Sequence, residues 1–238
     1  MNETIPAAFA AAIRKDPTVP LLTWYDDTTG DRTELSGATM DNWVAKTANL
    51  LVDGAGLGPG DTAAVLLPPH WQTAAILLGT WAAGPEVHTG PQALTVDALF
   101  AWPATAEESN SWAAGERYAT GLLPLAMPLR PVPTGFVDYT VEVRGQGDRF
   151  VAIQPVTPDD PALNAATHRE ISARATARAR DLGIEPGARV MIDAQAHPDP
   201  VDWLLAPLVV GASIVLCAGL DPAVIAKRVA AEQVTHTL

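Results

Sequence analysis

Two short stretches, Gly56-Leu57-Gly58-Pro59-Gly60 and Gly183-Ile184-Glu185-Pro186-Gly187, lie 127 residues apart and share the pattern Gly-x-x-Pro-Gly. Apolar and glycine positions match at the same offset without a gap, pairing Val65 with Ile192, Leu77 with Leu204, Leu78 with Leu205, Gly84 with Gly211 and Val87 with Ile214. An internal repeat reveals a repeated structural unit. The sequence therefore predicts that the unit formed by residues 41–90 recurs over residues 168–217.

Each copy has the pattern of a helix, a buried strand, a second helix and a second strand. The expected elements are 43–51, 63–67, 71–83 and 86–89 in the first copy, and 169–181, 189–194, 200–210 and 213–217 in the second. One more helix and strand are expected at 225–232 and 234–238. Strands that alternate with helices favour parallel pairing, with the helices packed on the sheet.

The region between the copies has a different composition. Residues 91–133 are rich in proline and alanine, and we expect an extended, packed connection because proline disfavours helices and central strands. Alternating polarity over residues 136–144 predicts a half-buried strand, followed by a turn at 145–148 and a second strand at 149–156. The predicted fold is α/β with two related subdomains, residues 1–133 and 134–238, each a mainly parallel sheet with flanking helices.

Composition and charge exclude several classes of protein. The net charge of −12 argues against binding to nucleic acid or to anionic membranes, and 48% hydrophobic with only 18% charged residues is typical of a folded chain. A single cysteine, Cys217, cannot form an internal disulfide, which fits the cytoplasm.

Residues 1–20 lack the pattern of a targeting signal. The uncharged stretch 203–220 is interpreted as a helix, a turn and a strand, because Pro207 and Gly211 interrupt it.

Residues 33–84 and 203–216 resemble the adenylate-forming superfamily, which contains acyl-CoA synthetases, luciferases and nonribosomal-peptide adenylation domains. The resemblance rests on Thr33-Glu34-Leu35, Ala48-Asn49-Leu50-Leu51, the first glycine-rich turn, Val65-Leu66-Leu67-Pro68, Leu77-Leu78-Gly79-Thr80-Trp81-Ala82-Ala83-Gly84, the stretch from Trp203 to Leu216, Asp221-Pro222 and Val234-Thr235-His236. It implies a short, actinobacterial-type relative that carries only the N-terminal part of the family fold. The family's later nucleotide motifs and its catalytic C-terminal domain have no counterpart here.

The family's phosphate loop is also degenerate by this comparison. The family pattern is rich in Ser, Thr and Gly, ends in Pro-Lys-Gly and is followed by a His-Arg pair, which Thr167-His168-Arg169 matches. Pro161-Ala162-Leu163 then stands at the Pro-Lys-Gly position, with no glycine in residues 154–160. Such loops hold phosphate through backbone N–H groups and a lysine. The degenerate positions are Thr157, Asp159, Asp160 and Ala162, and we expect no nucleotide cofactor there.

Several other residues are candidates for a site. By the resemblance, His197 and Trp203 could line a pocket for a small acyl-type ligand, although a structural role is the alternative for each. The sequence predicts that His70 is structural and that His168 is solvated at a helix start. No serine lies in a nucleophile-elbow motif, Cys217 has no basic neighbour in sequence, and no metal-ligand spacing occurs. We therefore expect no catalytic residue and no metal ion.

Three functions follow as hypotheses. The first is a catalytically degenerate relative of AMP-binding enzymes that acts as a binding or interaction module. The second is a half-enzyme that keeps an acyl or adenylate pocket and needs a partner chain for acyl activation. The third is an unrelated enzyme on the same scaffold, which no motif supports. A homodimer or a protein partner is expected, because a shortened domain exposes apolar surface.

Overall fold

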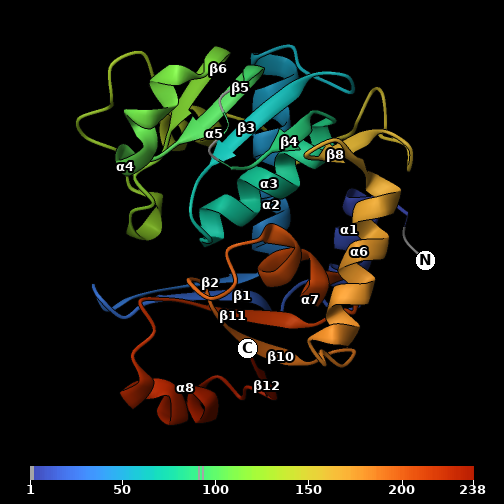
Figure 1. The fold of residues 1–238 in the computed structure, drawn as a ribbon, viewed down its shortest axis with the longest axis vertical. Helices are drawn as coiled ribbons and strands as arrows, with labels where there is room; N and C mark the ends of the chain where they lie inside the picture. Colours follow the sequence, from blue (N-terminus) through green and yellow to red (C-terminus); the bar gives the residue numbers. More distant parts are fainter. Residues whose placement is uncertain (1–2, 91, 93) are drawn as a thin grey trace. The chain divides into compact units, whose positions relative to one another are not determined.

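The computed structural model describes residues 3–90, 92 and 94–238 (Figure 1). By their internal contacts the residues form two units, each built from separated parts of the sequence. Unit 1 comprises residues 1–40, 68–74 and 169–238, and unit 2 comprises 41–67 and 75–168. The sequence instead predicts two subdomains that divide between residues 133 and 134. That division is based on the internal repeat and not on contacts, and it stays a prediction.

Unit 1 contains a five-stranded sheet in the order β12-β10-β11-β1-β2. Its strands are β1 (Pro20–Asp26), β2 (Asp31–Ser36), β10 (Arg189–Asp193), β11 (Ser213–Ala218) and β12 (His236–Thr237). All neighbours pair in parallel except β1 and β2, which are joined by a short turn that ends at Gly30 with φ +80°. A connection this short permits only antiparallel pairing.

The helices of unit 1 cover both faces of this sheet. They are α1 (Ile5–Ile13), α6 (His168–Asp181), the π-helical turn η4 (Val201–Leu205), α7 (Ala206–Val209), the 3₁₀ turn η5 (Pro222–Val224) and α8 (Ile225–Ala231). Figure 1 shows α8 on the opposite face of the sheet from α7. Ile225 and Val229 of α8 pack against Met191, Val215 and Cys217 of the sheet.

Unit 2 contains a seven-stranded sheet in the order β7-β6-β5-β3-β4-β8-β9. Its strands are β3 (Thr62–Leu66), β4 (Glu86–His88), β5 (Thr95–Ala101), β6 (Ala113–Ala119), β7 (Val137–Asp138), β8 (Pro161–Leu163) and β9 (Ala166–Thr167). Every pair is parallel except β8 and β9. The fold class predicted from the sequence, α/β with two mainly parallel sheets, is confirmed.

Two long helices of the first repeat supply most of the helical cover of unit 2. The helical elements are α2 (Gly37–Asn49), the π-helical turn η1 (Leu50–Gly54), α3 (Trp71–Ala83), α4 (Pro103–Ala106), the 3₁₀ turns η2 (Glu108–Ser111) and η3 (Pro124–Ala126), and α5 (Tyr139–Arg144). Gly79 of α3 lets the backbone approach α2, because a Cβ there would lie 2.4 Å from Thr47 Cβ. The Thr47 hydroxyl is also hydrogen bonded to the buried Tyr139 hydroxyl at 2.7 Å.

The internal repeat is visible in the strand registers. In the first copy β3 pairs with β4, with Thr62 opposite Glu86 and Ala63 opposite Val87. In the second copy β10 pairs with β11, with Arg189 opposite Ser213 and Val190 opposite Ile214. The second pairs are the first pairs displaced by the same 127 residues, so the repeat found in the sequence is a repeat of structure.

Three expectations for the region between the copies are wrong. Residues 91–133 include β5 and β6, two strands of the sheet, so only the segment after Ala119 is a proline-rich connection. Residues 136–144 form the two-residue strand β7 and then α5, because the Asp138 side chain caps the helix by accepting from Thr140 N. Residues 149–156 form no strand.

Among the described residues, no helix is both long enough and apolar enough to cross a membrane. The stretch 203–220 instead forms part of η4, then α7, a turn at Gly211 (φ +67°) and β11, as the sequence predicts.

Candidate functional site

The hairpin formed by β8 and β9 occupies the place of the expected phosphate loop. Its strands pair antiparallel, with Pro161 opposite Thr167 and Leu163 opposite Ala166. Only Asn164 and Ala165 join them, with φ +48° and +67°, as in the two-residue turns that close tight hairpins. Pro161–Leu163, expected at the Pro-Lys-Gly position, is therefore a strand. Only Asn164 favours such a turn, because asparagine accepts a positive φ and alanine does not.

Both backbone N–H groups of this turn are already hydrogen bonded inside unit 2. Asn164 N donates to Val87 O at 3.0 Å, and Ala165 N donates to the Glu86 carboxylate at 2.5 Å. The Asn164 side chain accepts from Thr89 N and donates to its hydroxyl. Glu86 also lies 3.5 Å from His88 Nε2. The Glu86 carboxylate thus accepts the hydrogen bond that this backbone N–H would otherwise donate to an external anion.

The residues just before β8 form a second closed turn. Thr157 N donates to the Asp160 carboxylate at 2.6 Å, and Asp160 N donates to Thr157 O at 3.3 Å. Asp159, also a predicted site residue, lies exposed in this turn. Ala162 is fully buried in β8, where its carbonyl oxygen accepts from Trp81 Nε1 at 2.8 Å. The four predicted positions therefore lie in a hydrogen-bonded turn and in the strand that follows it, and their role stays a prediction.

His168 is buried, so the prediction of a solvated side chain is wrong. Its backbone N–H donates to Asp160 O at 3.0 Å, and its side chain is fully enclosed. Burial lowers the pKa of His168 to about 4, although the nearby Asp160 carboxylate opposes this change. The imidazole is consequently neutral near pH 7 and supplies no positive charge for a phosphate.

His197 and Trp203 lie in unit 1 and face different surroundings. His197 Nδ1 lies 3.6 Å from Asp202 Oδ2, and Asp202 is held by two hydrogen bonds from Arg178 at 2.7 and 2.9 Å. The Arg178 bonds lower the pKa of Asp202. Trp203 is 1% exposed in the core. Neither residue lines the cavity between α1, α6 and α7, and their role in a ligand pocket stays a prediction.

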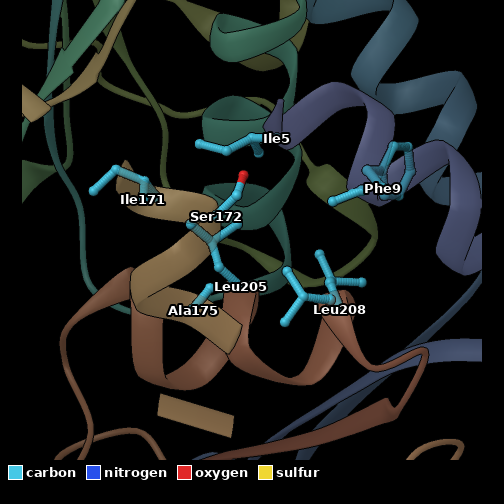
Figure 2. Close-up of a pocket in the computed structure, with 9 residues that line it drawn as sticks. Ile5, Phe9, Ile171, Ser172, Ala175, Leu205 and Leu208 are labelled. Atoms are coloured by element: carbon cyan, nitrogen blue, oxygen red, sulfur yellow. The ribbon is translucent and has the colours of Figure 1, made fainter. Parts of the chain in front are cut away.

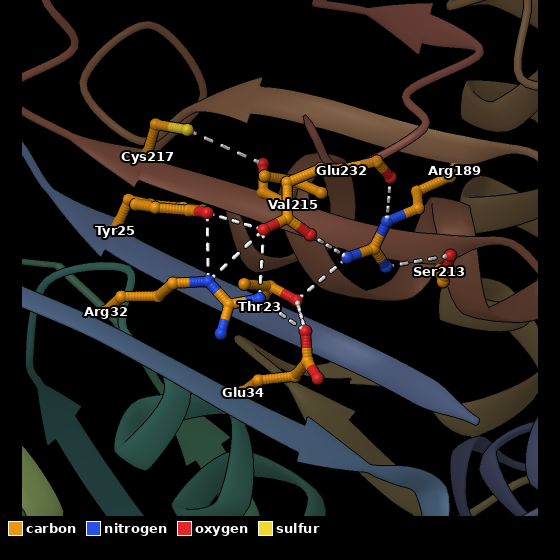
Figure 3. Close-up of polar contacts among 9 residues, drawn as sticks. All are labelled: Thr23, Tyr25, Arg32, Glu34, Arg189, Ser213, Val215, Cys217 and Glu232. Atoms are coloured by element: carbon orange, nitrogen blue, oxygen red, sulfur yellow. Dashed lines mark hydrogen bonds and ion pairs between the residues drawn. The ribbon is translucent and has the colours of Figure 1, made fainter. Parts of the chain in front are cut away.

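Sequence reasoning missed a polar network on the sheet of unit 1 (Figure 3). The buried Glu232 carboxylate accepts from Tyr25 Oη at 2.5 Å, from Arg32 Nη2 at 2.9 Å and from Arg189 Nη2 at 2.5 Å. Burial raises the pKa of Glu232, but these hydrogen bonds outweigh it and lower the pKa to about 2. The donors come from the β1–β2 hairpin and from β10, which lies far from that hairpin in sequence, so no local motif could have revealed the network.

Cys217 has a basic neighbour in space, although none lies beside it in sequence. Arg228 Nη1 donates to Cys217 Sγ at 3.5 Å, while the same guanidinium pairs with Asp27 and lies 4.1 Å from the centre of the Tyr25 ring. Burial nevertheless raises the pKa of the Cys217 thiol, which Arg228 only partly offsets. A reactive thiolate is therefore not expected at this position.

His70 is buried in unit 1, a position that agrees with the predicted structural role. The ring is 2% exposed, packs edge-on against Trp24 at 4.3 Å and accepts from Gln72 N through Nδ1 at 3.1 Å. Burial lowers the pKa of His70 to about 3. Across the described residues, no group of three or more His, Cys, Asp or Glu side chains could hold a metal ion.

Comparison with known proteins identifies the relatives of this chain. No family model matches. A protein of Mycobacterium tuberculosis described as a TIGR03089 family protein is 40% identical over 247 residues, which cover 99% of this chain and 100% of that protein. The chain belongs to the TIGR03089 family.

Solved structures of acyl-CoA ligases share the fold of this family member. They include an acyl-CoA synthetase of Brucella canis (TM-score 0.74, 17% identity, 97% of this chain and 46% of that one) and the anthranilate CoA ligase AuaEII with anthranoyl-AMP (TM-score 0.72, 14% identity, 98% and 48%). The N-terminal domain of FACL13 from Mycobacterium tuberculosis also matches (TM-score 0.71, 12% identity, 98% and 62%). The chain therefore has the fold of the N-terminal part of these enzymes and spans about half the length of the full-length ones.

A small cavity lies between α1, α6 and α7 of this family member (Figure 2). Its volume is about 10 Å³, and it is lined by Ile5, Ala8, Phe9, Ile171, Ser172, Ala175, Leu205, Leu208 and Val209. Ser172 is 4% exposed, and its hydroxyl has no hydrogen-bond partner among the residues that the structure describes. A buried water needs at least two polar partners, which this apolar lining does not offer.

Replacing Ser172 by alanine is expected to stabilise the protein. The substitution removes an unsatisfied buried hydroxyl, and we expect the free energy of unfolding to rise by about 1 kcal/mol. Urea denaturation followed by circular dichroism measures this change. The matched control is Ser36→Ala, which removes a hydroxyl that accepts from Thr39 N at the start of α2 and should lower the stability by about 1 kcal/mol. Destabilisation by Ser172→Ala would show that its hydroxyl is paired in solution.

Proposed function

We propose that the chain is a catalytically degenerate relative of AMP-binding enzymes that acts as a binding or interaction module. The observation that carries this proposal is the closed turn at Asn164 and Ala165, whose two N–H groups are bonded to Val87 O and to the Glu86 carboxylate. A phosphate loop needs several free N–H groups and gains from a lysine. This hairpin offers neither.

Electrostatics support the same conclusion. The Glu86 carboxylate adjoins the turn, and Asp159 and Asp160 lie just ahead of β8. Each would repel the phosphates of ATP, and the buried, neutral His168 adds no compensating charge. We also propose that the protein is cytoplasmic, as the lone cysteine suggests. The species that the module binds is a protein partner or a second copy of the chain.

Isothermal titration of the purified chain with Mg-ATP tests the proposal. We expect no saturable heat up to about 1 mM, which corresponds to binding weaker than about 4 kcal/mol. An acyl-CoA synthetase measured in the same buffer is the positive control. Saturable binding of Mg-ATP, or formation of acyl-adenylate, would contradict the proposal.

Two further titrations test what excludes Mg-ATP and whether the chain is a half-enzyme instead. Glu86→Gln removes the charge beside the turn but leaves the turn at two residues, so we expect it to bind no Mg-ATP either. Binding by that variant would mean that repulsion alone excludes the nucleotide. Tight binding of a non-hydrolysable acyl-adenylate analogue without binding of ATP would instead favour a half-enzyme that takes a small acyl-type ligand and requires a partner chain.

A further inference from the structure

An open groove lies in unit 2 just after the carboxyl end of β5. Four residues of the segment 103–110 line one side of it, and residues 129–134 and 136 line the other. We call it the Arg130 groove. Its volume is about 580 Å³, within the range of roughly 300–1,000 Å³ that is typical of small-molecule sites. It shares no lining residue with the β8–β9 hairpin, so the proposed function does not account for it.

A single helical face forms the first side of the Arg130 groove. The lining residues on this side follow the spacing of one face across α4 and η2, namely Pro103, Ala106, Glu107 and Asn110. The Thr105 hydroxyl, on the same segment, donates to Leu66 O at the end of β3 at 2.9 Å. This side of the groove is therefore anchored to the central strand of the sheet.

The loop on the second side is held in place by three contacts. Leu129 N donates to the Asp138 carboxylate at 2.7 Å, and Phe136 N donates to Pro133 O at 3.1 Å. The Arg117 guanidinium lies 4.7 Å from the centre of the Phe136 ring. The prolines of the loop also restrict its backbone. Since both sides are fixed, a ligand does not have to order them, and such preorganisation favours binding.

Two charged side chains of opposite sign line the groove. Glu107 comes from the helical side and Arg130 from the loop, and both are exposed. Neither side chain has a hydrogen bond or an ion pair with a residue that the structure describes, so they do not pair with each other across the groove. The other lining residues are apolar except Asn110 and Thr134.

Other charged groups of this region make their contacts inside unit 2 and do not line the groove. Arg117 and Arg144 donate to backbone carbonyls, and the Asp138 carboxylate accepts from backbone N–H groups. Among the described side chains that line the groove, a bound ligand therefore meets one free guanidinium and one free carboxylate.

This arrangement selects the chemistry of the ligand. A guanidinium binds a carboxylate, and a carboxylate binds an ammonium group. A ligand with only one of these charges would pair with one side of the groove and be repelled by the other side. A neutral apolar ligand would remove water from both charges without replacing it. The ligand that satisfies both sides carries an ammonium group and a carboxylate joined by an apolar body.

We propose that the Arg130 groove binds a small apolar zwitterion, a free amino acid or a short peptide, with its carboxylate on Arg130 and its ammonium group on Glu107. The apolar body lies against Leu129 and Phe136 of the loop and Ala106 of the helical side. This inference goes beyond the proposed function, because it assigns a small-molecule site that the loss of nucleotide binding does not require. The titration with Mg-ATP and the test below can therefore fail independently.

An NMR titration of the full isotope-labelled chain tests this assignment. The probes are leucine, dileucine and trileucine with free termini, each added up to about 10 mM, since a few exposed contacts give binding in the millimolar range. We expect saturable shifts of the backbone signals of residues 103–110 and 129–136. Equal affinity for leucine and the peptides would support an amino-acid site, and tighter binding of trileucine would support a peptide site.

Capped probes and two variants test each charge contact separately. Acetylation of the amino group of the tightest-binding probe, or amidation of its carboxylate, should weaken binding to the parent chain by about threefold to fivefold, because each removes one exposed ion pair. Glu107→Gln should bind the free and the acetylated probe equally, and Arg130→Gln should bind the free and the amidated probe equally. Both variants should fold, since both side chains are exposed. Glu142→Gln and Arg149→Gln remove exposed charges outside the groove and should leave all affinities unchanged.

Three outcomes would overturn the proposal. The absence of a saturable shift with every probe would mean that no ligand of this class binds. Shifts confined to residues outside the groove would place the binding elsewhere. Affinities of the parent chain that stay the same on acetylation and on amidation would show that apolar contact alone holds the probe, so that neither charge recognises it.

Discussion

Replacing Gly84 by alanine should lower the free energy of unfolding by about 3–5 kcal/mol, because it combines a steric clash with a forbidden backbone conformation. Gly84 follows α3, has φ +118° and donates its N–H to Thr80 O. A Cβ at this position would lie 2.5 Å from both the N and the Cδ of Pro59. Pro59 belongs to the Gly-Leu-Gly-Pro-Gly turn that leads into β3, so a shift that relieves the clash would disturb the start of that strand.

The internal repeat supplies the control for this experiment. Gly211 is the counterpart of Gly84 in the second copy, but its φ is +67° and no atom lies within 4 Å of an added Cβ. Gly211→Ala should therefore cost only about 1–2 kcal/mol, the cost of the left-handed conformation alone. Guanidinium denaturation of both variants measures the difference. Equal losses of stability at the two positions would mean that the contact with Pro59 relaxes.

Removing the carboxylate of Glu232 should have the second largest effect. Glu232→Ala leaves Arg32, Arg189 and the Tyr25 hydroxyl without their common partner, and we expect a loss of about 2–4 kcal/mol since breaking a buried ion pair strands its charges. Glu34 is the matched control, because its carboxylate pairs with Arg32 and Thr23 and its side chain is 34% exposed. Glu34→Ala should cost less than about 1 kcal/mol.

The same network predicts how stability depends on pH. The pKa of Glu232 is about 2 in the folded chain, against an ordinary value of 4.5. The stabilisation is therefore fully present above about pH 4.5 and is lost as the pH falls toward 2. Urea titrations of the parent chain and of Glu232→Gln between pH 2.5 and 6 measure this contribution. We expect the stability of the variant to fall less steeply over this range, and parallel curves would contradict the assignment.

The parts of the fold that the sequence predicted correctly are those encoded by local pattern. The Gly-x-x-Pro-Gly turns, the apolar period of the helices and the short apolar strands recur at one fixed offset, and the strand registers repeat at that offset. Glycine supplies the positive φ that these turns need, with φ +72° at Gly56 and +68° at Gly183. These features hold wherever the segment is placed in the tertiary structure.

The errors have a common cause. Residues 136–144 alternate in polarity as a strand does, yet Tyr139 and Val143 are buried four residues apart on one side of α5. A short segment is compatible with both periods, and only its neighbours decide between them. Likewise β5 and β6 lie within the stretch interpreted as an extended connection, where they are paired by partners distant in sequence.

The candidate site shows the same division. The sequence by itself determined that residues 154–163 lack the glycines and the lysine of a phosphate loop, since composition is a local property. Only the tertiary structure decided that Glu86 and Val87 accept the hydrogen bonds of the turn's N–H groups and that His168 is buried. It also decided that the Glu232 carboxylate accepts hydrogen bonds from residues of three strands. Burial and pairing depend on which distant segments meet, and the free energy that selects those contacts is a sum over the whole packed unit rather than a property of any one stretch.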